Sequence, residues 1–279
     1  MAQADVNKED YVPKYHTITH HFLDLERKEG FPVTDAEYET LDRIIAQAET
    51  KIKARPNCSR KEAINSLQKI DAILTSNGFQ YQTRMILSEA LKTKRTNCVT
   101  SSFIYKAIAE TLDLPVHFSR APAHLFIRWG LNDKGYVNWE TTSVPACECP
   151  TQHYQRVMPI ADSSIKDGVY LTGLTKTEAL ALPYAHIGFI LQRKGDLHKA
   201  IKYYTKAITL YPKHAESHNN IGEAYIKLGN YEKAIAALTK AIELHPLSPE
   251  SYNKRSIAYH KMGEKEKAID DACTAFELS

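Results

Sequence analysis

The sequence predicts an α+β domain followed by an all-α array of paired helices, on three observations. Apolar residues recur at helical spacing through most of residues 34–112. Between residues 116 and 142, three short stretches then have the residue pattern of β-strands, and a turn signal separates the last two. From residue 181 onward the chain repeats itself every 34 residues. The expected domains are a polar N-terminal arm (1–32), a mixed domain (33–178) and a repeat array (179–279).

Composition is that of an ordinary globular protein. The chain has 279 residues, enough for two domains that each bury a core. Hydrophobic residues make up 43% of the sequence and the formal net charge is only +3. A charge this small argues against nucleic acid as a partner. No stretch reaches the roughly 18 apolar residues that a membrane span needs, so no membrane partner is expected either.

The expected compartment follows from the N-terminal residues and the cysteines. The first ten residues are polar and lack the apolar core of a secretory signal. Five cysteines, an odd number, are widely scattered and do not resemble a disulfide framework. We therefore expect a cytoplasmic protein; export without a leader is the alternative that the sequence leaves open.

Local capping signals delimit the first helices. Before them, the arm is expected to hold at most one short helix. Thr34 and Glu37 form a capping box in front of a helix that Pro56 should end. Ser59 caps a second helix, which Asn77-Gly78 terminates.

Two more helices and three strands complete the mixed domain. One helix is predicted over Phe79–Lys94, with Met85 among its apolar residues, and Asn97 caps another that Leu114-Pro115 ends. Strands are expected at Val116–Arg120, His124–Gly130 and Tyr136–Thr142, with a hairpin turn at Asn132–Gly135. The segment from Ser143 to Lys176 is predicted to be irregular and to wrap back over the domain.

Small residues recur at fixed places in the 34-residue period. Gly188 returns as Gly222 and is replaced by Ser256, while alanines recur at equivalent positions of each period: Ala200, Ala234 and Ala268, then Ala207, Ala241 and Ala275. Such positions are small because paired helices approach closely there. The pattern resembles tetratricopeptide repeats. Three repeats fit, at residues 181–214, 215–248 and 249–279.

Three residues with catalytic chemistry stand where these elements begin and end. Cys98 occupies the first turn of a helix, where unpaired N–H groups and the helix dipole stabilise negative charge. His124 heads a strand, and Glu140 lies on the strand that returns from the hairpin, which makes the two near neighbours. A thiol, an imidazole and a group that orients the imidazole are the requirements of thiol-based acyl transfer or hydrolysis.

Other residues compete for these roles. His117 is an alternative base one strand earlier, and Asn138 could orient an imidazole as an amide. Asp133 is better explained as a turn residue. Glu140 is preferred to Asn138 because a carboxylate also stabilises the imidazolium.

The order of these residues resembles the transglutaminase-like superfamily and its papain-like core, a Cys-bearing helix packed on an antiparallel sheet. The match covers roughly residues 80–145, through Asn97-Cys98-Val99, Pro122–Arg128 and Asn138–Thr142. The resemblance implies Cys98 as nucleophile, His124 as base and Glu140 as orienting acid. The chain departs from many members in having Glu instead of Asp at the third position and Val99 instead of an aromatic residue after the cysteine.

The reaction expected from this resemblance is attack of the thiolate on a carboxamide or peptide carbonyl. The Cys98 backbone N–H would hold the oxyanion, with Gln82 as a candidate second donor. Acyl transfer to an amine and hydrolysis both remain open, because the superfamily contains transferases, peptidases, amidases and inactive relatives. The rival interpretation is a non-catalytic interaction scaffold.

By resemblance, the inner helices of the repeats form a concave groove that would bind a protein or peptide. The groove residues are Ala185, Phe189, Gln192, Asn219, Glu223, Ile226, Asn253, Ile257 and His260. Bracing of the catalytic domain is the alternative role of the array. The last repeat lacks a capping helix after it, and we expect its apolar face to be covered by a homodimer contact.

No metal or cofactor is expected. Cys147-Glu148-Cys149 with His153 lacks a second pair of zinc ligands and is interpreted as loop cysteines. His16, His20 and Asp24 share a helical face, which we interpret as solvated.

Overall fold

The computed structural model describes residues 12–82, 86–133, 135–142 and 146–279. The chain divides into two compact units. The first comprises Met1–Val116, Leu131–Lys134 and Thr141–Cys147; the second comprises His117–Gly130, Gly135–Glu140 and Glu148–Ser279. The N-terminal region mixes helices with an antiparallel sheet and the C-terminal region is all helical, as predicted.

The first unit begins with a buried helix, α1 (Ile18–Lys28), where the sequence predicted a polar arm. Phe22 is fully buried and its ring lies 4.9 Å from that of Phe103. His20, expected on a solvated face, is only 3% exposed and its Nε2 lies 2.9 Å from Asp42 Oδ1. The expectation for His20 was wrong because the apolar stripe of α1 is interleaved with histidines and charges, whereas Asp24 is exposed as expected and the one short helix of the arm is present. Residues 1–11 of the predicted arm lie outside the described residues.

Helices α2 (Asp35–Lys51) and α3 (Arg60–Ser76) begin at the predicted caps, Thr34 and Ser59. Glu37 and Glu62 both close back onto the backbone of their N-cap residues, which confirms these predictions. Helix α3 ends at Ser76, with Asn77 as its C-cap and Gly78 following at a positive φ of 83°, as predicted. Helix α2, in contrast, ends at Lys51, ahead of Pro56, because the chain becomes extended at Ile52.

The helix predicted over Phe79–Lys94 is wrong. Strand β1 (Gln80–Tyr81) pairs in parallel with β2 (Arg95–Thr96), and of the described residues between them Leu87–Thr93 form a helix, α4. Met85, which the prediction used, lies outside the described residues. The helix starts late because Glu26 of α1 accepts hydrogen bonds from the backbone N–H groups of Leu87 and Ser88, at 2.7 and 2.8 Å.

Helix α5 (Cys98–Thr111) begins at the predicted cap. Asn97 Oδ1 accepts from the Thr100 N–H at 2.9 Å, and Thr100 Oγ1 accepts from the Asn97 N–H at 2.9 Å. The helix ends before Asp113, which has a positive φ of 49°. Its middle is fully buried, through Phe103, Ile104, Ala107 and Ile108.

A four-stranded sheet has the order β3 (Val116–Ala121), β4 (His124–Gly130), β5 (Tyr136–Glu140) and β6 (Cys147–Glu148). Strands β4 and β5 are antiparallel and pair Ile127 with Trp139 and Arg128 with Asn138. Strand β5 ends at Glu140, two residues before the predicted end. Asn132 and Asp133 form a turn as predicted, while Lys134 lies outside the described residues.

The segment from Ser143 to Lys176 is more regular than predicted, although Ser143 itself lies outside the described residues. It contains α6 (Thr151–Val157) and α7 (Asp162–Lys166), and α8 (Lys176–Ala179) follows at its end. These helices are short, which explains why periodicity did not reveal them. Their segment covers one face of the sheet, where a buried cluster joins Ala121, Phe126, Cys149, Tyr154, Val169, Tyr170 and Leu171.

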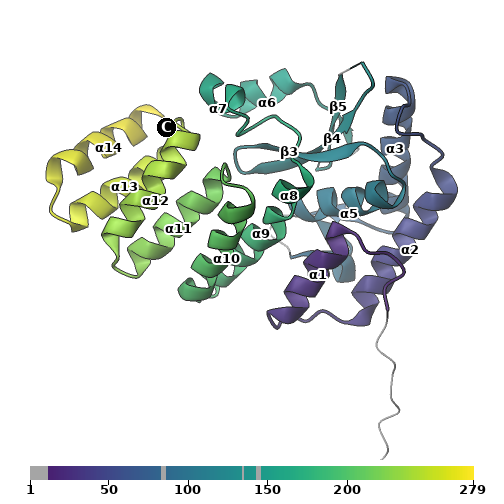
Figure 1. Ribbon diagram of the computed structural model, residues 1–279, viewed down its shortest axis with the longest axis horizontal. Coiled ribbons are helices and arrows are strands. Elements are labelled where there is room, and N and C mark those ends of the chain that lie inside the picture. Colours follow the sequence, from purple (N-terminus) through teal and green to yellow (C-terminus); the bar gives the residue numbers. More distant parts are fainter. Residues whose placement is uncertain (1–11, 83–85, 134, 143–145) are drawn as a thin grey trace, which may run out of the picture. The chain divides into compact units, whose positions relative to one another are not determined.

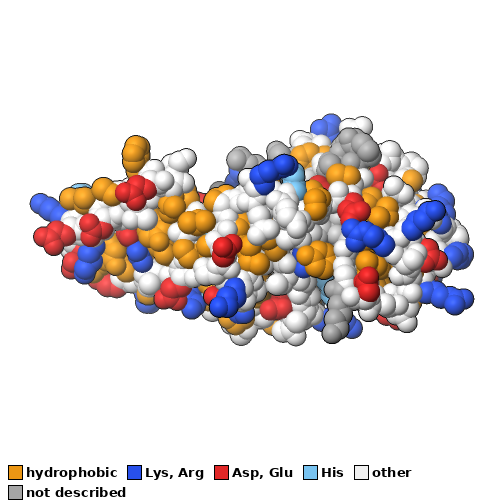
Figure 2. Space-filling model, turned by 90° about the horizontal axis from the view of Figure 1, so that it is seen from above, with side chains coloured by type: hydrophobic (Ala, Val, Ile, Leu, Met, Phe, Trp, Pro, Cys, Tyr) orange, Lys and Arg blue, Asp and Glu red, His pale blue; other side chains and the backbone are white. Residues whose placement is uncertain are grey.

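Six helices of the second unit form three successive antiparallel pairs (Figure 1): α9 (Ala181–Arg193), α10 (Leu197–Leu210), α11 (Ala215–Lys227), α12 (Tyr231–Leu244), α13 (Pro249–Lys261) and α14 (Lys265–Glu277). A Cβ atom on Gly188 would lie 2.9 Å from the Tyr204 ring, and one on Gly222 would clash with Leu238. The repeated small residues are therefore contact points between paired helices. Figure 2 shows hydrophobic side chains lying among acidic and basic ones along this array.

An ion pair joins the sheet to the repeats within the second unit. Arg120 of β3, 5% exposed, donates to Glu216 of α11, which also accepts from the Ala123 N–H at 3.3 Å and from Tyr170 Oη at 3.4 Å. Burial alone would raise the pKa of Glu216, but the Arg120 guanidinium lowers it to about 2. The unit thus crosses the predicted domain boundary at residue 178, and the three-part division stays a prediction.

Glu26 should make the stability of the protein depend on pH. Burial raises the pKa of its carboxyl group to about 7, against the hydrogen bonds that favour ionisation. Because this pKa is above the unfolded value, the folded state binds the extra proton, and the free energy of unfolding should fall as pH rises from about 4.5 to 7, by at most about 3 kcal/mol. Urea midpoints of wild type and Glu26→Gln at pH 5 and pH 8 measure this effect. We expect a smaller fall in the variant; equal falls would contradict the assignment.

Glu216→Gln should lower the free energy of unfolding by about 2–4 kcal/mol, because it leaves the buried Arg120 guanidinium without its counter-ion. The midpoint of urea unfolding reports the change. Glu232→Gln, at an exposed position of α12, is the matched control and should have little effect. A control and a variant with the same midpoint would show that the pair contributes nothing.

Candidate active site

The sheet brings His124 and Glu140 into direct contact. His124 starts β4 and Glu140 ends β5, so the hairpin places both at the same end of the strand pair. The imidazole Nε2–H donates to Glu140 Oε2 at 2.7 Å. The two side chains are 15% and 14% exposed, so the contact is largely screened from water. In this geometry the carboxylate fixes the orientation of the ring.

Tyr154 of α6 adds a second donor to the same carboxylate. Its Oη lies 3.4 Å from Glu140 Oε2, and its ring stacks on Phe126 at 4.2 Å and lies 6.1 Å from the His124 ring. Burial, and then the charge of Glu140, raise the pKa of Tyr154, which keeps the phenol protonated. Sequence reasoning missed this residue; Pro150-Thr151 as a helix start was the local signal that could have located it.

The competing residues have other contacts. Asn138 Oδ1 accepts from Arg128 Nε at 2.8 Å, and its amide donates to Thr151 Oγ1 at 3.1 Å. His117 has an exposed side chain on β3, next to Gly173. Asp133 lies in the turn before β5. Of the residues considered for the orienting role, Glu140 is the one in contact with His124.

Cys98 is the first residue of α5, a position set by the Asn97 cap. Its thiol is free and partly buried. The 14-residue helix behind it directs its N-terminal N–H groups toward this end, where they favour an anion. Cys98 belongs to the first unit and His124 and Glu140 to the second. The pairing of the thiol with the imidazole therefore stays a prediction.

Gln82 lies beside the strand that leads into α5. Its backbone N–H donates to the Thr96 carbonyl at 2.6 Å, which fixes the backbone two residues before Cys98. The side-chain Oε1 accepts from Arg95 Nη1 at 2.6 Å. Because the arginine occupies the amide oxygen, the NH₂ group is the end of the Gln82 amide that can donate to another acceptor. The role itself stays a prediction.

The predicted groove residues divide into buried and exposed ones. Gln192 accepts from Tyr204 Oη at 2.9 Å, and Asn219 accepts from Ser251 Oγ at 3.1 Å; both side chains are buried and stabilise the array internally. Phe189 and Ile257 are 40% and 48% exposed. The other exposed or half-buried positions are Ala185, Glu223, Ile226, Asn253 and His260.

Two lysines form ion pairs with Glu223 at the centre of this surface. Lys227 Nζ lies 2.6 Å and Lys254 Nζ 2.7 Å from its carboxylate. Burial would raise the pKa of Glu223, but the hydrogen bonds from these lysines lower it to about 2. Glu223 is therefore ionised and neutralised from within the array, so its charge is not available to attract a ligand.

Of the two cysteines predicted to lie in a loop, Cys147 is exposed and belongs to β6, which corrects that expectation, and Cys149 is buried beside Tyr154. Within the described ranges, no three His, Cys, Asp or Glu side chains gather as a metal site would require. In the same part of the chain, no helix combines the length and hydropathy needed to cross a membrane.

Known protein families match two separate parts of the sequence. The family model of the transglutaminase-like superfamily matches residues 35–143. Two tetratricopeptide repeat models match residues 179–246 and 221–277. No curated protein matches the chain.

Solved structures of tetratricopeptide domains are similar to part of the chain. The first tetratricopeptide domain of Spaghetti (RPAP3) bound to an HSP90 peptide is 25% identical and covers 36% of this chain and 79% of its own, with a TM-score of 0.35. The tetratricopeptide domain of Arabidopsis OM64 is 22% identical and covers 37% of this chain and 85% of its own, with a TM-score of 0.37. The chain therefore joins a transglutaminase-like domain to a C-terminal array of tetratricopeptide repeats.

Proposed function

We propose that this protein catalyses thiol-dependent acyl transfer or hydrolysis on a peptide or carboxamide substrate, through Cys98, His124 and Glu140. The observation that carries the proposal is the 2.7 Å contact between the His124 imidazole and the Glu140 carboxylate. A buried carboxylate on one ring nitrogen makes the other a better base and stabilises the imidazolium that forms. Its value for catalysis depends on a thiol beside the ring.

In the proposed reaction, Nδ1 of His124 takes the Cys98 proton, because Nε2 faces Glu140. The thiolate adds to the carbonyl carbon, and the resulting oxyanion is held by the Cys98 backbone N–H and the Gln82 amide. The C–N bond then breaks, the imidazolium gives its proton to the leaving amine, and a thioester remains on Cys98. Water or a second amine attacks the thioester, loses a proton to His124 and releases the thiol.

Three features support this assignment. The transglutaminase-like family model spans Cys98, His124 and Glu140. The helix that begins at Cys98 favours a thiolate at its N-terminus. Tyr154 gives Glu140 a second hydrogen bond, so the carboxylate that orients His124 is itself held.

For the repeats we propose binding of a protein partner or substrate segment. Tetratricopeptide arrays present extended surfaces that suit peptides, and Phe189 and Ile257 give this surface exposed apolar contact points. The same exposed residues favour the second candidate function, an interaction scaffold in which the transglutaminase-like domain has lost turnover. Reactivity of the thiol separates the two.

Alkylation with limiting iodoacetamide at neutral pH should modify Cys98 about tenfold faster than Cys58, whose pKa is raised by burial. Mass spectrometry of the digested protein measures each rate. His124→Ala should slow the labelling of Cys98, and His117→Ala, on the neighbouring strand, is the matched control that should not. Similar rates at all five thiols would support the scaffold.

Turnover should depend on the orienting carboxylate. With a glutamine-containing protein as substrate and a tagged primary amine, Cys98→Ala should abolish product and Glu140→Gln should lower kcat/KM by about 10²–10⁴-fold. Incorporated tag identifies a transferase, ammonia without tag an amidase, and cleaved fragments a protease. Full activity in Cys98→Ala would exclude the mechanism.

A further inference from the structure

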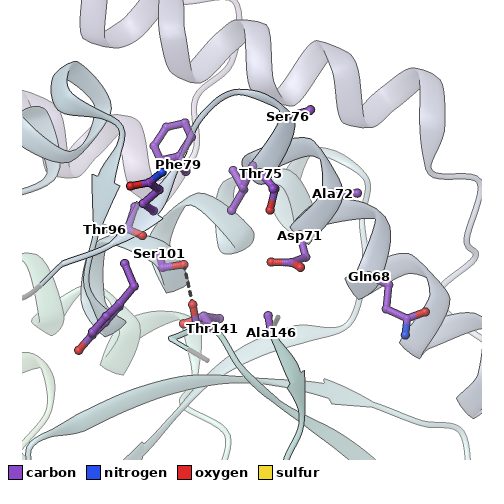
Figure 3. A pocket seen from close by; sticks show the side chains of 13 residues that line it. Gln68, Asp71, Ala72, Thr75, Ser76, Phe79, Thr96, Ser101, Thr141 and Ala146 are labelled. Atoms are coloured by element: carbon purple, nitrogen blue, oxygen red, sulfur yellow. Dashed lines mark hydrogen bonds between the residues drawn. The ribbon is translucent and has the colours of Figure 1, made fainter. Parts of the chain in front are cut away.

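A cavity of about 1000 Å³ opens in the first unit. Its walls come from α3, the β1–β2 pair, the first turns of α5 and the chain at Thr141 and Ala146 (Figure 3). Thr96 and Ser101 of this wall lie two residues before and three residues after Cys98. Because residues three apart share a helix face, Ser101 places the cavity on the same side of α5 as the proposed nucleophile.

The wall combines apolar surface with neutral hydrogen-bonding groups. Leu74, Phe79 and Ala146 supply the former, and Gln68, Thr75 and Gln80 the latter. The Ser101 hydroxyl already donates to the Thr141 carbonyl at 3.4 Å. Among the lining residues that the structure describes, Asp71 alone carries a formal charge. Figure 3 shows its carboxylate extending from α3 into the cavity.

The Asp71 carboxylate is held in place by neutral donors. It accepts a hydrogen bond from Tyr105 Oη at 3.5 Å and another from the Ala146 backbone N–H. No lysine, arginine or histidine of the described residues forms an ion pair with it. Burial raises the pKa of Asp71, a sign that water and these donors compensate the charge incompletely. A cation would supply the missing compensation.

We propose that this cavity binds a lysine or arginine side chain of the substrate polypeptide, with Asp71 as the residue that selects it. The aliphatic stem of such a side chain would lie along the apolar wall while its charged end reaches the carboxylate. The volume leaves room for neighbouring residues of the same polypeptide. This inference rests on the proposed function, which puts the reacting carbonyl at Cys98 nearby.

The basic group in this cavity is a recognition element and does not act as the nucleophile. An ammonium paired with a carboxylate keeps its proton and has no lone pair with which to attack a thioester. A guanidinium stays protonated in any protein environment. The cavity would therefore determine which polypeptide is modified. It would not determine whether water or an amine attacks the thioester.

Binding can be measured without turnover on the full-length Cys98→Ala protein. The probes are acetylated, amidated Gly-X-Gly peptides in which X is lysine, arginine, norleucine or glutamate, titrated by NMR. We expect the lysine and arginine peptides to bind about tenfold tighter than the norleucine peptide. Asp71→Asn, which retains an acceptor for Tyr105, should reduce them to the norleucine level. Asp71→Glu should keep the preference, and Glu39→Gln, at an exposed position of α2, should change nothing.

Equal binding of the lysine and norleucine peptides, or an undiminished preference in Asp71→Asn, would overturn the proposal. Preference for the glutamate peptide would overturn it as well. The outcome is independent of the reaction. An unreactive Cys98 with an Asp71-dependent preference refutes the proposed chemistry alone, and a reactive Cys98 without that preference refutes the cavity assignment alone.

Discussion

The second unit depends on one buried ion pair. Arg120 lies in the sheet and Glu216, 96 residues later, opens the second repeat. Arg120 is nearly inaccessible to water, so its charge is tolerable only because a carboxylate faces it and the Tyr170 and Tyr211 rings flank it at 5.8 and 5.7 Å. Together with the hydrogen bonds from Tyr211 Oη to the Val169 carbonyl and from Ser164 Oγ to the Leu244 carbonyl, the pair joins the sheet and the repeats in one compact unit. The repeats thereby contribute to holding the strand that precedes His124.

The candidate site depends on the geometry of a β-hairpin, in which the end of the second strand lies beside the start of the first. Strand β4 leaves from His124 and β5 comes back at Glu140, so two residues 16 apart in sequence meet with little backbone freedom. Tyr154 of α6 then donates a second hydrogen bond to this carboxylate. Because all three side chains are largely removed from water, the attraction between imidazolium and carboxylate is stronger than at an exposed surface.

Local signals made much of this predictable. The caps at Thr34, Ser59 and Asn97 and the hairpin turn depend on residues only a few positions apart, the repeats announce themselves by their 34-residue period, and the meeting of His124 with Glu140 follows from the turn. The errors have non-local causes. Residues 79–94 are not one helix because Glu26, some 60 residues earlier, satisfies the first N–H groups of α4. Helix α1 is buried by partners such as Phe103, and the roles of Tyr154 and Asp71 depend on neighbours that no spacing reveals.

The backbone conformation of Ala123 fixes the direction in which the chain enters β4 at His124. Its φ of +54° is a left-handed conformation that costs residues with a Cβ roughly 1–2 kcal/mol, and it stands between Pro122 and His124. Glycine would adopt this angle freely but would also swing through a wide range of others. Alanine has a narrower range of φ than glycine, and the Ala123 N–H donates to Glu216 at 3.3 Å. The backbone at Ala123 is thus restricted. The position of the His124 ring relative to Glu140 is therefore set by the chain that precedes the strand.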